Sequence, residues 1–128
     1  MKRLRIIGIV VALLVMVSTF SFAEYDRDVV KTVMRDNVSL MGAVSKAAKQ
    51  EDYLAAGQAL MKLAEGAFAV KDYEPPKGTA EEWEETWEAF IVAAFKGIGA
   101  CGEEDKRGLD DAIKELKKLN GQGHRDHR

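Results

Sequence analysis

The chain has 128 residues, with 21 acidic and 19 basic side chains and a formal net charge of −2. This length fits one domain with a modest core. The acidic balance argues against nucleic acid as a partner, because phosphate binding needs a basic surface. Cys101 is the only cysteine, so no disulfide can form within the chain.

The first residues have the order of a secretory signal peptide. Three basic residues lie within the first five positions, an apolar run extends from Ile6 to Val17, and Ser21 and Ala23 are small. This order predicts cleavage after Ala23, which assigns residues 1–23 to the signal peptide and 24–128 to an exported, periplasmic domain. The apolar run is shorter than the roughly 20 residues of a spanning helix, so we expect no membrane association after cleavage. A retained membrane anchor is the alternative.

Two amphipathic helices are predicted in the first half of the remaining chain, which shows helical periodicity and no strand-like alternation. The first runs from about Asp26 to Lys49, and the second from about Asp52 to Val70. Pro75 and Pro76 prevent the second helix from continuing. The predicted inward residues are Val30, Val33, Met34, Leu40, Met41, Val44 and Ala48 in the first helix and Tyr53, Ala56, Leu60, Leu63, Ala67 and Val70 in the second.

Two more helices follow the prolines. The third opens at Thr79, which forms a capping box with Glu82, and it ends near Gly102. The fourth begins around residues 103–105. Four helices with short connections predict an all-α fold, an antiparallel up-down-up-down four-helix bundle. The predicted inward residues are Trp83, Trp87, Phe90, Ile91, Ala94, Phe95 and Ile98 in the third helix and Leu109, Ile113, Leu116 and Leu119 in the fourth.

Catalytic motifs are missing from the sequence. It contains no Gly-rich phosphate loop after a strand, no Cys-x-x-Cys and no evident Ser/His/Asp arrangement. The glutamates of the third helix are typical of a solvated face, and the inward Glu-x-x-His pairs of di-iron bundles do not occur. We therefore do not expect an enzyme.

His124 continues the apolar face of the fourth helix if that helix persists beyond Leu119. Leu116, Asn120 and His124 follow each other at intervals of four residues, which keeps them on one face. Gly121 and Gly123 oppose the extension, because each costs about 1 kcal/mol relative to alanine in a helix.

The alternative is a flexible tail after Leu119. In that tail His124 and His127 are solvated, or they bind a divalent metal ion together with Asp126. We rank metal binding last, because one short flexible segment supplies all the ligands and stable metal sites need ligands held by surrounding groups.

In these features the chain resembles the four-helix haem proteins, namely cytochrome c-prime and the soluble periplasmic four-helix b-type cytochrome. The resemblance covers the whole exported domain. It rests on the four-helix plan, on Asp36-Asn37 and Met41-Gly42, on Pro75-Pro76-Lys77, and on the C-terminal tail. In c-type members the last helix ends Cys-x-x-Cys-His-x-x-aromatic-Arg. Here that register reads Asn120-Gly-Gln-Gly123-His124-Arg-Asp-His127-Arg128.

The ligand histidine and the final Arg128 of that pattern are present, but Asn120 and Gly123 replace the two haem-attaching cysteines. The resemblance therefore implies a non-covalent, b-type haem with His124 as the iron ligand, acting in electron transfer or small-gas binding. The second ligand of the b-type relatives, a methionine, falls on Val38, which cannot bind iron. Either Val38 is an apolar distal residue beside five-coordinate iron, or Met34 or Met41, each about one turn away, supplies the sixth ligand.

The resemblance also implies apolar walls for the haem between the first, third and fourth helices, and a redox partner protein. Residues available for the walls are Trp87, Phe90, Phe95, Leu40, Met41 and Leu116. Cytochrome c-prime members commonly pair through their first two helices, and the Ala-rich faces of these helices here allow a homodimer. The alternative is a cofactor-free periplasmic structural or interaction protein that kept the bundle and lost its haem. The missing cysteines and methionine favour that alternative.

Overall fold

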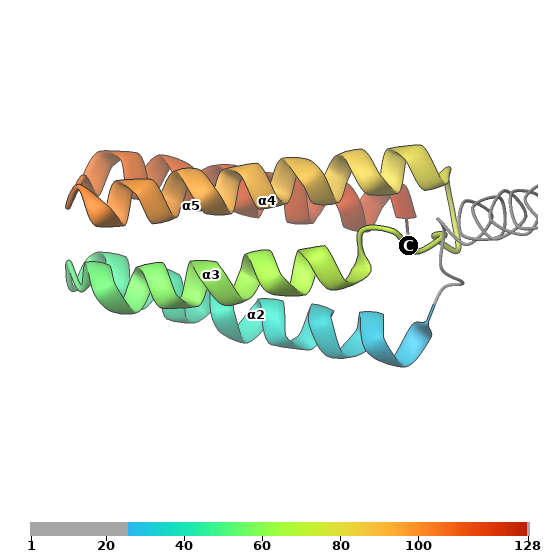
Figure 1. Cartoon of the computed structure of the whole chain (residues 1–128), viewed down its shortest axis with the longest axis horizontal. Helices are drawn as coiled ribbons and strands as arrows, with labels where there is room; N and C mark the ends of the chain where they lie inside the picture. The colour runs from blue at the N-terminus through green and yellow to red at the C-terminus, as the bar shows by residue number, and fades with distance from the viewer. Residues whose placement is uncertain (1–25, 128) are drawn as a thin grey trace, which may run out of the picture.

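The computed structural model describes residues 26–127, without the side chain of His127; the predicted signal peptide and Arg128 lie outside the described residues. The described chain forms four helices, α2 (Arg27–Lys49), α3 (Tyr53–Val70), α4 (Ala80–Gly102) and α5 (Lys106–His127). Consecutive helices run antiparallel, and the α2–α3 hairpin lies against the α4–α5 hairpin (Figure 1). The predicted all-α four-helix bundle is therefore confirmed. None of the described helices is long and apolar enough to span a membrane.

Each helix begins at a side chain that accepts hydrogen bonds from its first turn. The carboxylates of Asp26, Asp52 and Asp105 accept backbone N–H groups at the starts of α2, α3 and α5. At the start of α4, the Thr79 hydroxyl accepts the Glu82 N–H at 3.1 Å, and the Glu82 carboxylate accepts the Thr79 N–H at 3.4 Å. The predicted capping box is thus confirmed. These contacts satisfy N–H groups that have no partner within the helix.

The two short turns between helices have the same construction. Glu51 and Glu104 adopt the left-handed conformation, with φ of 54° and 53°. The next residue in each turn, Asp52 or Asp105, donates its N–H back to the last turn of the preceding helix at 2.9 or 2.8 Å and caps the following one. Both turns lie at one end of the bundle, and the longer loop between α3 and α4 lies at the other, beside the end of α5 (Figure 1).

The core consists of small and branched apolar side chains and of three aromatic ones on α4, most of them at the positions that the sequence periodicity predicts. Of the predicted inward residues of α3, all but the half-buried Tyr53 are buried, and all four of α5 are buried. Phe95 is an exception, because 48 % of it is exposed. The inward position beside it belongs to Ala94, which is fully buried. Helices α3 and α4 approach closely along this face. One turn after Ala94, even a Cβ added to Gly97 would lie 2.8 Å from Leu60, so large side chains do not fit between the two helices.

The four seams between neighbouring helices are unequally packed. Helix α4 packs extensively against both α3 and α5, and α2 packs extensively against α3. Helices α2 and α5 contact each other over a much shorter stretch. Separation of α2 from α5 would therefore break fewer apolar contacts than separation of any other pair of neighbouring helices.

Candidate functional site

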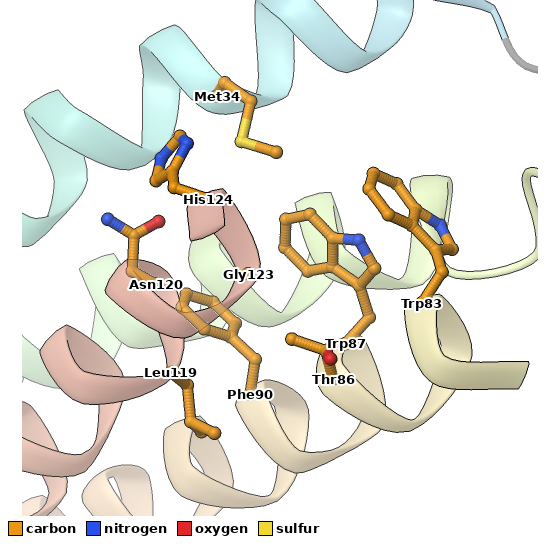
Figure 2. A pocket seen from close by; sticks show the side chains of 9 residues that line it. All are labelled: Met34, Trp83, Thr86, Trp87, Phe90, Leu119, Asn120, Gly123 and His124. Atoms are coloured by element: carbon orange, nitrogen blue, oxygen red, sulfur yellow. The ribbon is translucent and has the colours of Figure 1, made fainter. Parts of the chain in front are cut away.

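An apolar pocket lies between α2, α4 and α5 at the end of the bundle that carries the long loop (Figure 2). Its interior void is about 30 Å³, which holds about one or two water molecules. Three helices contribute to it, and its lining residues are Met34, Trp83, Thr86, Trp87, Phe90, Leu119, Asn120, Gly123 and His124.

One wall of the pocket is a row of three aromatic side chains on α4. Trp83, Trp87 and Phe90 are all less than 7 % exposed. Each ring meets the next edge-to-face, with centroids 5.6 Å apart in both pairs, a geometry that adds to the stabilisation from burial. The indole N–H of Trp83 donates to the carbonyl of Val70 at 2.8 Å. This bond ties α4 to the end of α3 and fixes the wall.

His124 lies on the opposite side of the pocket from this wall. Helix α5 continues through residues 121–123 as far as His127, so the structure has the continued helix and not the alternative tail after Leu119. Leu119 is buried, and Gly123 lies against α4, where a Cβ would be 3.5 Å from the Thr86 methyl group. The partly buried imidazole of His124 points toward α2 (Figure 2). It forms no hydrogen bond with any residue whose side chain the structure describes.

Met34 of α2 faces His124 across the α2–α5 seam. Its thioether extends into the pocket beside the imidazole and toward Trp87 (Figure 2). Four residues expected at the site from the sequence, Met34, Trp87, Phe90 and His124, therefore lie together although they come from three helices. Their residue types provide two groups able to bind iron and two large apolar walls.

Five other residues expected at the site do not line the pocket: Val38, Met41, Leu116 and the two further wall candidates Leu40 and Phe95. Leu40 is partly buried on α2, and 48 % of Phe95 is exposed. Val38 is 74 % exposed and does not line the pocket, so its distal role beside an iron stays a prediction that this arrangement does not support. It follows the buried Asn37 and lies about 100° further around α2, on the solvent side. Leu116 is fully buried deeper in the core, and Met41 packs partly buried against the core. Arg128 lies outside the described residues.

Some residues at or near the pocket were missed by the sequence reasoning. Trp83, Thr86 and Asn120 line the pocket, and the buried Asn37 lies one turn along α2 from Met34. The Asn37 side-chain nitrogen has no hydrogen-bond partner among the described residues. A signal for its burial exists in the sequence, because Asn37 lies seven residues after Val30 and seven before Val44, and both valines are buried.

The described residues contain no group of three or more His, Cys, Asp or Glu side chains placed to hold a metal ion. The metal set considered as the last-ranked alternative, His124, Asp126 and His127, includes one side chain, that of His127, outside the described part. Because α5 is helical here, residues 124 and 126 lie about 200° apart around its axis. His124 and Asp126 therefore cannot face one ion from the same side of the helix.

Comparison of the chain with protein-family models and with curated protein sequences finds no match. The functional argument consequently depends on the chemistry of the pocket.

Proposed function

We propose that this protein is an exported haem-binding four-helix protein that acts in electron transfer or small-gas binding, with a non-covalent, b-type haem ligated by His124. The observation that carries the proposal is the placement of the His124 imidazole. It is partly buried, lines an apolar pocket beside Met34, and has no hydrogen-bond partner among the described side chains. Buried polar groups normally have partners, and an imidazole nitrogen is a common ligand of haem iron.

Met34 supports a second ligand position. Its thioether lies beside the His124 imidazole and comes from the opposite helical hairpin. Methionine and histidine together raise the reduction potential of haem iron, and such six-coordinate sites favour one-electron transfer. Met34 and His124 would hold the group, while Trp87 and Phe90 would cover it and exclude water. Val38 has no part in this proposal, because it faces solvent.

The size of the pocket sets a condition on haem binding. The void of about 30 Å³ holds only about one or two water molecules, so a haem enters only if helices move apart. The α2–α5 seam beside Met34 and His124 is the least extensively packed. Separation of α2 from α5 therefore makes room with the smallest loss of core contacts, because the other three seams stay closed.

A second candidate function is that of a cofactor-free interaction bundle. The small void and the almost complete burial of Trp83 and Phe90 favour it. In that case the aromatic row packs the end of the core, and the unpartnered His124 has no ligand to hold. Both candidates predict the same fold, so only a binding measurement separates them.

The test is a haem titration of the purified protein followed by absorption spectroscopy. We expect a saturable, one-to-one Soret band that His124→Ala abolishes and that His127→Ala, the matched control for the other histidine, retains. Met34→Leu, which conserves volume, should keep the band and change the reduced spectrum from six- to five-coordinate. Absence of a saturable band, or a band indifferent to His124→Ala, would contradict the proposal and favour the cofactor-free bundle.

Export is tested separately. When the full chain is expressed in a bacterial host with a periplasm, we expect the protein in the periplasmic fraction with the mass of residues 24–128. A protein that stays with the membrane at full length would instead indicate a retained anchor.

A further inference from the structure

Exposed apolar side chains gather on the outer face of α3 and α4. On α3, Leu54, Met61 and Phe68 are 75 %, 46 % and 50 % exposed, and their spacing of seven residues places them along one stripe. On α4, Phe95 is 48 % exposed, and Val92, one turn before it at the edge of the α4–α5 groove, is 51 % exposed. The rings of Phe68 and Phe95 meet across the seam with centroids 6.3 Å apart. These five residues are called the α3–α4 patch.

The patch is as large as the apolar part of a stable interface. Phenylalanine buries roughly 150–250 Å² when it is covered, so each half-exposed ring offers about 100 Å². With the three aliphatic side chains, the patch offers roughly 500 Å², within the range of the largest apolar patches on monomers, which are often functional. At an apolar fraction of roughly 60 %, this corresponds to about 800 Å² of total surface, the share of each partner in an interface of standard size.

The charges around the patch identify the kind of partner. Lys62, Glu65 and Glu104 line the outer α3–α4 groove together with Leu54 and Met61. On α4, the exposed Glu88 and Lys96 lie one turn either side of Val92, and Glu88 also lies 4.0 Å from the Lys71 ammonium. Acidic and basic side chains thus both border the patch. A rim of both signs can pair with an identical rim, whereas a strongly basic or acidic partner would be matched by charges of a single sign.

We propose that the α3–α4 patch is the surface through which two copies of this chain form a two-fold symmetric dimer. In such a dimer the same surface of each copy contacts the other, so a patch with a mixed-charge rim meets the requirement for self-complementarity. The outer α2–α3 groove fits this role less well, because the large apolar side chains of its lining, Val33 and Leu40, are both partly buried. The exposed Val38 of α2 is also absent from that lining.

The position of the patch keeps the dimer compatible with the candidate site. The α3–α4 and α2–α5 seams lie on opposite sides of the bundle, since each helix packs mainly against its neighbours in the chain. Pairing through α3 and α4 therefore leaves the α2–α5 seam and His124 uncovered. The dimer requires no haem, so its test is independent of the proposed function.

The experiment is sedimentation equilibrium of the purified protein from about 1 to about 100 μM, with the intact mass of the same sample measured by mass spectrometry. We expect an average mass that rises toward twice the chain mass with concentration. Phe68→Ser and Phe95→Ser should each weaken the dimer at least about tenfold, as expected for an aromatic side chain near the centre of an interface. A monomer over the whole range would overturn the proposal.

Two further variants keep the test decisive. Val38→Ser removes an equally exposed apolar side chain outside the patch, and it should leave the dissociation constant unchanged. Leu54→Ser removes the most exposed side chain of the patch, so it should weaken the dimer even if the phenylalanine variants lose helical circular dichroism. A dimer that survives Leu54→Ser, Phe68→Ser and Phe95→Ser, or that Val38→Ser disrupts, would assign the interface to another surface.

Discussion

Replacement of Asn37 by leucine should stabilise the bundle, although it removes a polar group from the core. Asn37 is 4 % exposed, and its side-chain nitrogen has no hydrogen-bond partner among the described residues. An unsatisfied buried amide costs about 1–3 kcal/mol. Leucine branches at the same side-chain carbon as asparagine. The Asn37 amide oxygen faces Gly66, and a Cβ added to that glycine would still lie 3.8 Å from the oxygen. The methyl group that replaces the amide oxygen therefore has space on this side.

The expected magnitude follows from two contributions. Removal of the amide penalty contributes about 2 kcal/mol, and the better helix propensity of leucine contributes roughly 0.5 kcal/mol. For a domain of about 100 residues, this raises the Tm by about 10 °C or more. The assay is urea unfolding followed by circular dichroism, which gives the free energy of unfolding from the midpoint and slope.

Val38→Leu is the matched control for Asn37→Leu. It changes the adjacent residue on the solvent side of the same helix, where 74 % of the side chain is exposed, and it should alter stability by less than about 0.5 kcal/mol. If Asn37→Leu lowers the free energy of unfolding while Val38→Leu does not change it, the reasoning is refuted. The amide would then have a stabilising partner, such as a buried water molecule.

Three more predictions concern packing, capping and the buried thiol. Gly97→Ala should destabilise the bundle by about 1 kcal/mol after its propensity gain, because the new Cβ would lie 2.8 Å from Leu60. The control Gly99→Ala, with no heavy atom within 4 Å of its Cβ, should stabilise the bundle by up to about 1 kcal/mol. Equal effects of the two substitutions on the free energy of urea unfolding would contradict the packing argument. Thr79→Ala should cost about 1 kcal/mol in the same assay through loss of the capping box, and an unchanged midpoint would show that water replaces the cap. Burial raises the pKa of the Cys101 thiol, so the folded state favours the neutral form. Stability should therefore fall as the pH rises above the ordinary thiol pKa of about 8.5. Alkylation of Cys101 should accelerate sharply on unfolding, and equal alkylation rates in the folded and unfolded protein would contradict the burial of the thiol.

The sequence by itself determined the helices and most of their inward faces. Capping is a contact within one turn, as at Thr79 and Glu82, and a run of apolar residues at helical spacing identifies the face that needs cover. Both signals are local, so the ends of α2, α3 and α4 fall within a residue or two of the predicted positions. The inward series of α3 and α5 were predicted for the same reason.

Only the tertiary structure decided the site. Local propensity at Gly121 and Gly123 disfavours a helix, but packing of α5 against α4 carries the helix through to His124. The register taken from the family resemblance placed Val38 in the pocket, whereas the packing of α2 turns Val38 outward and brings Met34 to the histidine. The small void and the exposed Phe95 likewise depend on how closely α4 approaches its neighbours. Such distances arise from side chains far apart in the chain, and no local pattern encodes them.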